Sequence, residues 1–265
     1  MTPELLAAGI RRAVIEESRR ANVGHIGSAL SIADLLAALY AGPLAGKGDG
    51  ADRDRVVLSK GHAALALYAA LELTGRLPAG TLGTYCADGS LLGVHPEREL
   101  AGVDFSTGSL GQGLPMAVGA ALAGRLEGSP RRVFAILSDA ELNEGVVWEA
   151  AMFAAHHELG RLVVLVDVNG QQALGRTADV LDLGDVCARW AGFGWDARDV
   201  DGHDTAALTT AIAGLDLDGP RPHVLVAHTT FGRGVSFMEG RIEWHYLPMS
   251  AEEHLRALAE LEAAA

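Results

Sequence analysis

Short, mostly apolar segments alternate with longer segments of helical periodicity along much of the chain. The clearest are RVVL at 55–58, VFAIL at 133–137, LVVLVDV at 162–168 and HVLVA at 223–227. Strands that are buried on both faces have this composition, and strands that alternate with helices usually pair in parallel. The pattern therefore predicts an α/β fold, doubly wound, with a mainly parallel sheet and helices on both faces.

No linker, repeat or low-complexity run divides the 265 residues, so we expect one domain over residues 1–265. The first helix is expected to follow Thr2 as its cap, and a second to begin at Ser31. A further strand is expected at 103–106, before a glycine-rich turn at 108–113 and an apolar helix. The last helix is expected at about 250–263.

Composition argues against several classes of partner and location. The net charge is −13 and no basic stripe is present, so nucleic acid is not an expected partner. Cys86 and Cys187 are too few and too far apart for a disulfide framework or a zinc site. No segment approaches the roughly 18 apolar residues of a membrane span, and the N-terminus has no export signal. We therefore expect a cytoplasmic protein with no membrane contact.

Polar side chains follow two of the predicted strands. Asp139 follows the strand at 133–137, and Asn169 follows the strand at 162–168. In parallel sheets the carboxyl ends of the strands share one edge, where ligands bind. A carboxylate and an amide oxygen at that edge are hard ligands of the kind that magnesium or calcium prefers. An alternative of equal weight is that Asp139 caps the following helix.

The turn GSLGQG at 108–113 has the spacing G-x-x-G-x-G, which is neither the dinucleotide fingerprint nor a phosphate-binding P-loop. By itself it predicts either a ligand contact or a close strand-to-helix crossing. Histidines also lie in short turns, namely VGHIG, SKGHA, GVHPE, DGHD and EWHY. A single loop histidine is usually incidental, but several at one sheet edge indicate a site that handles protons or binds hydroxyl groups.

Several motifs together resemble, in order, the diphosphate-binding domain of transketolase. They span roughly residues 20–248 and are GHIGSALSIADLL, SKGHAALALYAAL, GVHPE, STGSLGQGL, SDAELNEGVVWEA, LVDVN and GRGVSFMEGRIEWH. The resemblance implies thiamine diphosphate and a divalent cation, Mg²⁺ or else Ca²⁺ or Mn²⁺. The metal ligands it implies are Asp139, Asn169 and the main-chain carbonyl of Gln171.

The same resemblance assigns further roles. Diphosphate contacts would come from the N–H of Ala140 and the side chains of His62 and His245. The thiamine would be lined by Gly108, Ser109 and Leu110. The sugar hydroxyls and the reacting carbonyl oxygen would meet His25, His95 and His245. Glu144 matches the family's buried glutamate at a subunit contact, and Glu141 is expected to serve the N-terminus of a helix, whose dipole favours acid.

The match departs from the family in the metal motif. The family has Gly-Asp-Gly, and this chain has Ser138-Asp139-Ala140. A methyl group on Ala140 is expected to weaken cofactor binding if the backbone there needs a positive φ.

Full-length transketolases continue into a pyrimidine-binding domain whose glutamate activates the cofactor, and nothing in this sequence matches it. The resemblance therefore implies the amino-terminal subunit of a split transketolase. Its partner would be a separate pyrimidine-binding C-terminal transketolase subunit, in an α2β2 assembly. The reaction would transfer a two-carbon ketol unit from a ketose to an aldose, with a sugar or a sugar-phosphate-like substrate.

Three alternatives remain at the level of the sequence. The chain could be a non-catalytic or regulatory relative that has lost cofactor affinity through Ser138 and Ala140. It could be a subunit of a thiamine diphosphate enzyme that decarboxylates 2-oxoacids, although the loop histidines suit a polyhydroxylated substrate better. A metal-dependent phosphohydrolase needs only Asp139 and Asn169 and leaves the histidines unexplained.

Overall fold

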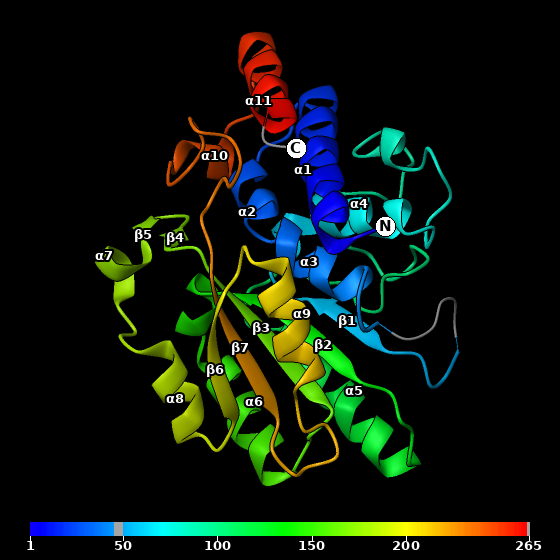
Figure 1. Cartoon of the computed structure of the whole chain (residues 1–265), viewed down its shortest axis with the longest axis vertical. Coiled ribbons are helices and arrows are strands. Elements are labelled where there is room, and N and C mark those ends of the chain that lie inside the picture. Colours follow the sequence, from blue (N-terminus) through cyan, green and yellow to red (C-terminus); the bar gives the residue numbers. More distant parts are fainter. Residues whose placement is uncertain (45–49, 264–265) are drawn as a thin grey trace.

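A parallel sheet lies at the centre of the computed structural model, which describes residues 1–44 and 50–263. Its five strands are ordered β1-β2-β3-β7-β6, and helices cover both faces (Figure 1). The strands of this sheet are β1 (Arg55–Leu58), β2 (Val133–Ser138), β3 (Leu162–Val168), β6 (Asp196–Asp201) and β7 (His223–His228). The predicted doubly wound α/β fold is confirmed.

The helices form two layers. One layer holds α5 (Gly113–Glu127), α6 (Gly145–His156) and α8 (Val186–Gly192). The other holds α1 (Pro3–Ala21), α2 (Ile26–Ser31), α3 (Ala33–Tyr40), α4 (Ala64–Leu73) and α9 (Thr205–Ala213), with α11 (Ala251–Ala263) packed on α1. Smaller elements connect these layers: α7 (Thr177–Leu181), α10 (Glu243–Tyr246), the 3₁₀ turns η1 (Gly61–Ala63), η2 (Leu82–Thr84) and η3 (Ala140–Asn143), and the antiparallel pair β4 (Gln171–Gln172) and β5 (Gly175–Arg176).

The continuously apolar strands feed both layers. In β2, Phe134 and Ile136 belong to one buried core, and Val133, Ala135 and Leu137 belong to the other. Successive side chains of a strand point to opposite faces, so a strand covered on both faces must be apolar at every position. This requirement explains the composition of the segments from which the fold was predicted.

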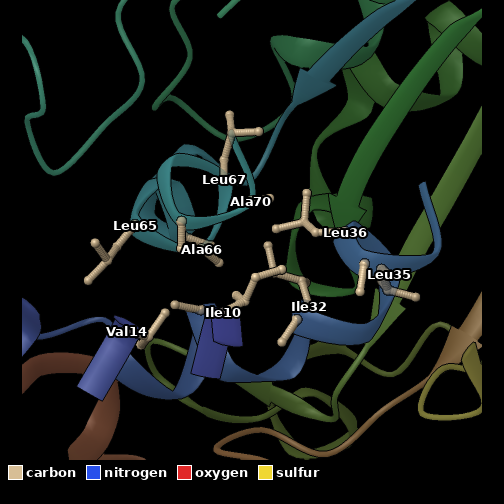
Figure 2. Packing of buried hydrophobic residues seen from close by; sticks show 14 of the residues in the cluster. Ile10, Val14, Ile32, Leu35, Leu36, Leu65, Ala66, Leu67 and Ala70 are labelled. Atoms are coloured by element: carbon tan, nitrogen blue, oxygen red, sulfur yellow. The ribbon is translucent and has the colours of Figure 1, made fainter. Parts of the chain in front are cut away.

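The larger core is formed mainly by helices α1, α3 and α4. Figure 2 shows Ile10 and Val14 of α1 facing side chains of α3 and α4, among them Leu36 and Leu65. The cap predicted for α1 is confirmed, because the Thr2 hydroxyl accepts a hydrogen bond from the Leu5 N–H at 3.4 Å. These helices support the loops that reach the carboxyl edge of the sheet.

Two local predictions were wrong. Residues 103–106 form no strand; instead the Asp104 carboxylate accepts the Val56 N–H at 3.0 Å and so satisfies the outer edge of β1. Ser31 does not cap a helix but ends α2, because its hydroxyl donates to the Ser28 carbonyl and to Asp167. The expected C-terminal helix is present as α11, and within residues 1–44 and 50–263 no helix is both long and apolar enough to span a membrane.

The α1 contacts predict a large effect of truncating one core side chain. Ile10 is 0% exposed, so Ile10→Ala should lower the free energy of unfolding by about 2–5 kcal/mol, through lost burial and the cavity it leaves. Leu5 on the same helix is 64% exposed, and Leu5→Ala should change that free energy by less than about 0.5 kcal/mol. Urea titration of both variants measures the difference, and equal losses would contradict the packing of α1 against its neighbours.

Candidate functional site

The ends of β2 and β3 bring Asp139 and Asn169 to one edge of the sheet. The two strands pair in parallel with Ser138 opposite Asp167, so the residues that follow them leave the sheet side by side. The Asp139 carboxylate accepts the Gly170 N–H at 2.9 Å, and Gly170 directly follows Asn169. The predicted convergence of an acid and an amide at this edge is therefore present.

Asp139 is buried and held by two elements. Its Oδ2 accepts the Gly170 N–H and the Thr177 hydroxyl, each at 2.9 Å, and its Oδ1 accepts the Ala140 N–H at 2.9 Å. Burial, and then the neighbouring Asp167, raise the pKa of Asp139 to about 6. An acid whose charge is penalised in this way gains strongly from a bound cation. The helix-capping alternative also holds in part, because Asp139 caps η3 through its contact with Ala140.

Asn169 is held in one orientation by its neighbours. Its Nδ2 donates to Asp167 at 2.8 Å, and its Oδ1 accepts the Gln171 N–H at 3.0 Å. Asn169 and Gln171 both line a small cavity at the carboxyl edge of the sheet. Gln171 begins the β4–β5 hairpin, and the hydroxyl of Tyr246 donates to the Ala173 carbonyl in that hairpin.

Three of the predicted histidines form a cluster at the cavity. The ring centroids of His25, His62 and His245 lie 5.2 to 5.5 Å apart, although the residues come from three separate segments: the start of α2, η1 and α10. Phe231 stacks on His245 with an interplanar angle of 12°. The cluster gathers imidazoles that sequence alone could place only near the same sheet edge.

Burial keeps these imidazoles neutral. Burial is the largest cause of the lowered pKa of His25. It is also the largest cause of the shift of His245, whose pKa is lowered to about 4. The pKa of His62 is lowered further below its usual value by burial, with the nearby Lys60 charge adding to the effect. Within the described residues, the Nδ1 atoms of His25 and His245 are buried without a hydrogen-bond partner. Neutral rings with free ring nitrogens can donate to or accept from a ligand.

Backbone interlocking fixes the position of His25. His25 has φ +61°, which is uncommon for a residue with a side chain, and its N–H donates to the His245 carbonyl at 3.2 Å. Gly24 lies so close to this turn that an added Cβ would overlap the Tyr246 carbonyl oxygen. The loop at 22–25 therefore needs Gly24 for close approach, while the positive φ falls on Asn22 and His25.

The cavity joins the cluster to the strand ends. It has a volume of about 120 Å³, and its walls include His25, His62, His245, Leu110, Ala140, Asn169 and Gln171. Sequence reasoning missed further wall residues, namely Ser28, Lys60, Gln172 and Ala173. The Ser28 hydroxyl lies 3.2 Å from Nε2 of His62. Lys60 was one of only two lysines, which was the signal available in the sequence.

Other predicted site residues lie beside this cavity rather than on its walls. His95 is exposed, and an added Cβ on Gly108 would come within 3.1 Å of its ring, so the turn and His95 are in contact. Ser109 belongs to the same turn. Glu144 is exposed in this chain and contacts the turn near Gly111.

Glu141 has a role beyond the one predicted for it at a helix N-terminus. It is fully buried, and it accepts the Gly111 N–H at 2.7 Å, the Ser59 hydroxyl and the Ser138 N–H. Burial raises the pKa of Glu141 against these hydrogen bonds. Glu141 therefore ties the glycine turn to the ends of β1 and β2, and its exchange of hydrogen bonds with Ser138 also serves the start of η3, as predicted. The turn is also a close crossing, since a Cβ on Gly113 would collide with the Ser59 hydroxyl.

Two further expectations are settled by backbone and contact geometry. Positive φ angles at residues with side chains fall on Asn22, His25, Cys86 and Glu158, so Ala140 does not carry the strained conformation that would penalise its methyl group. The turn histidine of DGHD, His203, lies away from the cavity: its Nδ1 is 2.7 Å from Asp34, and its Nε2 accepts the Thr230 N–H.

Comparison with known proteins identifies this arrangement. The family described as "Transketolase, thiamine diphosphate binding domain" matches residues 3–261. The chain belongs to this transketolase family. Transketolase structures show the same fold: that from Campylobacter jejuni superposes with a TM-score of 0.91 at 28% identity over 97% of this chain and 42% of its own. A Pichia stipitis transketolase in complex with sedoheptulose 7-phosphate superposes with a TM-score of 0.91 at 29% identity, over 98% of this chain and 40% of its own.

Shorter relatives match along nearly their whole length. The chain is 39% identical to a 6-deoxy-6-sulfo-D-fructose transketolase subunit of Clostridium sp. strain MSTE9, over 96% of this chain and 94% of that protein. It is 36% identical to an apulose-4-phosphate transketolase subunit of Phocaeicola vulgatus, over 98% and 94%. These relatives are named as subunits, whereas the solved transketolases are more than twice as long as this chain.

The cavity fits the diphosphate and cation that a transketolase domain implies. No group of three or more His, Cys, Asp and Glu side chains suited to a metal occurs within residues 1–44 and 50–263. The donors here are instead one buried carboxylate and one amide oxygen, which suit a hard cation that keeps phosphate oxygens as further ligands. The unpartnered Nδ1 atoms of His25 and His245 provide hydrogen-bonding groups for the ligand.

The neutral histidine cluster predicts acid sensitivity. An imidazole with a lowered folded-state pKa stabilises the fold above pH ~6.5. That contribution is lost as the pH falls towards about 4, the pKa of His245. The free energy of unfolding should therefore decrease as the pH falls over this range. In the His245→Gln variant the same free energy should decrease less steeply with pH. Chemical denaturation at several pH values measures how steeply the free energy of unfolding changes with pH in the unsubstituted chain and in the variant. Identical pH dependence in the two would contradict a lowered pKa for His245.

Alanine variants of Glu141 and Glu144 test whether the buried carboxylate stabilises the fold while the exposed one does not. Glu141→Ala leaves three buried donors without an acceptor, so the free energy of unfolding should fall by at least about 2 kcal/mol. Glu144→Ala removes an exposed carboxylate and should change it by less than about 0.5 kcal/mol in the isolated chain. Urea titration of both variants tests the pair, and a stable Glu141→Ala variant would refute the tethering role.

Proposed function

We propose that this chain is the thiamine diphosphate-binding subunit of a two-component, Mg²⁺-dependent transketolase. The observation that carries the proposal is the convergence of Asp139 and Asn169 at one sheet edge, next to a cavity lined by Asn169 and three neutral histidines. The relatives named as transketolase subunits support it, because this chain covers 94% of their length. Transfer of a two-carbon ketol unit from a ketose to an aldose is the reaction of this class.

The strand ends would hold the diphosphate end of the cofactor. Asp139, Asn169 and the main-chain carbonyl of Gln171 supply oxygen ligands for the cation, which neutralises charge that Asp139 alone would repel. The N–H of Ala140 now donates to Asp139, and a bound diphosphate oxygen would be an alternative acceptor for it. His62, with Ser28 beside it, and His245 would donate hydrogen bonds to the diphosphate. Gly108, Ser109 and Leu110 would lie along the thiamine.

Thiamine diphosphate, when bound, supplies the acidic ring carbon that takes up the two-carbon unit. The residues of this chain orient the substrate and carry its protons. His25, His95 and His245 would contact the sugar hydroxyls and the carbonyl oxygen. A neutral imidazole suits this work because one ring nitrogen donates a hydrogen bond to the carbonyl oxygen while the other accepts a hydroxyl proton.

A second, pyrimidine-binding subunit would complete the site in an α2β2 assembly. Glu144 is exposed in this chain, and the adjoining α6 exposes Val146 at 37%, Met152 at 51% and Phe153 at 42%. Apolar side chains exposed together on one helix are suited to a subunit contact. The two unpaired cysteines, Cys86 and Cys187, are consistent with a cytoplasmic location.

The donor would be a ketose with an anionic group at the end remote from the carbonyl. The relatives are named for 6-deoxy-6-sulfo-D-fructose and apulose 4-phosphate, which carry a sulfonate and a phosphate. The cavity walls in this chain offer imidazole, hydroxyl and amide groups for the hydroxylated end of such a sugar. The partner subunit would then bind the anionic end.

Reconstitution with the partner tests this function. Each chain alone should be inactive, and the mixture should transfer a two-carbon unit among sulfonated and phosphorylated ketoses only with thiamine diphosphate and Mg²⁺. The genes beside this one are the place to search for the pyrimidine-binding partner. A mixture that forms a complex yet shows no saturable heat with the cofactor and Mg²⁺ in calorimetry would refute the proposal and favour a non-catalytic subunit.

Asp139→Asn tests the metal assignment. The variant keeps the size of the side chain and an acceptor for Gly170, so the fold should be retained. Cation-dependent cofactor affinity should fall by more than about 100-fold, because loss of a direct ligand exceeds the 10–100-fold typical of groups behind the ligands. Calorimetry of the complex measures the affinity, with the exposed α6 residue His156→Ala as control. Unchanged affinity in Asp139→Asn would remove this residue from the metal site.

A further inference from the structure

Asp167 is a buried hub directly behind the proposed cation site. Its Oδ2 accepts hydrogen bonds from Ser31 at 2.8 Å, from Asn169 at 2.8 Å and from the Lys60 ammonium, and its Oδ1 accepts the Thr229 hydroxyl. The donors come from α2, from the segments after β1 and β3, and from the segment after β7. One carboxylate thus connects four segments at the carboxyl edge of the sheet.

The Lys60–Asp167 pair is an unusual choice if stability is its purpose. Both side chains are 0% exposed. Removing two charges from water costs several kcal/mol per ion, and apolar replacements of buried pairs are often neutral or stabilising. Nothing about packing requires an ion pair here, so its function is better sought in what Asp167 contacts.

The contact with Asp167, together with the Gln171 N–H, fixes which atom of the Asn169 amide faces the cavity. A primary amide has a donating end and an accepting end of nearly equal size, so shape alone cannot fix its orientation. A carboxylate paired with an ammonium carries no hydrogen and can only accept. Asp167 therefore holds the Nδ2 end of Asn169 inward, and the Oδ1 end is directed to Gln171 and the cavity. With the amide reversed, the donor end would face a cation and be repelled.

We propose that Asp167, with its charge balanced by Lys60, is a positioning residue that fixes the amide oxygen of Asn169 towards the cation. The inference rests on the proposed function, because it concerns the same cation site. It adds a residue that touches neither cofactor nor substrate. Groups in this position behind metal ligands typically contribute 10–100-fold to metal affinity.

Two double variants isolate the role of the acceptor. Lys60→Met with Asp167→Leu removes both charges and the acceptor, and Lys60→Met with Asp167→Asn removes both charges but keeps an oxygen that can accept from Asn169. The two variants have equal charge and the same number of side-chain heavy atoms. Binding of Mn²⁺ to the full chain, in complex with thiamine diphosphate and the partner subunit, is followed by the electron paramagnetic resonance signal of free Mn²⁺, and folding by thermal unfolding. The Leu variant should bind Mn²⁺ about 10–100-fold more weakly than the Asn variant. Both variants share the loss of Lys60, which lines the cavity, so the difference between them reports Asp167 alone.

Thr229→Val is the control for Asp167 itself. It removes a hydrogen bond from Oδ1, the oxygen that does not contact Asn169, and should leave Mn²⁺ affinity unchanged. Should the Leu variant not fold, Lys60→Met with Asp167→Ala removes the acceptor without added bulk. Equal Mn²⁺ affinity in the Leu and Asn variants, or an equal loss in Thr229→Val, would overturn the positioning role. Absence of Mn²⁺ binding by the unsubstituted complex would instead overturn the proposed function on which it rests.

Discussion

The register between β2 and β3 is the constraint on which the site depends. Ser138 lies opposite Asp167, so Asp139 and Asn169 leave the sheet together, and the N–H of Gly170 can reach Asp139. A slip of one residue would reverse the faces of every side chain in one strand and move its apolar residues out of their cores. The two separate cores on β2 therefore enforce the same register that the transketolase site needs. Stability and ligand geometry are set by one pairing.

Burial disfavours the charged form of both the acid and the imidazoles of the site, so it shifts their pKa values in opposite directions. The pKa of Asp139 is raised, and the pKa values of His25, His62 and His245 are lowered, because each group loses water around its charged form. The walls of the cavity, Lys60 apart, are therefore mostly uncharged, in a chain of net charge −13. Such a pocket favours a ligand that brings its own balanced charges, as a diphosphate with a divalent cation does.

Much of this architecture could be predicted from the sequence. Apolar runs such as 133–137 indicated a sheet covered on both faces, and Asp139 and Asn169 followed from strand ends meeting at one edge. The strand expected at 103–106 is absent because the Asp104 side chain, and not a further strand, accepts the outer N–H of Val56 in β1. The apolar character of a short segment cannot distinguish a pairing strand from a loop that supplies such a side chain. The buried contacts that Lys60 makes with Asp167 and that Glu141 makes with Gly111 were not predicted. They are long-range hydrogen bonds, which leave no periodic signal in the sequence.

The backbone contact between His25 and His245 joins two segments from opposite ends of the polypeptide. Gly24 is packed against the Tyr246 carbonyl at the same point, so neither loop has its final shape without the other. During synthesis the imidazole cluster consequently cannot assemble until residue 246 has left the ribosome. Chains that end before residue 246 would therefore lack the cluster, however complete their sheet is.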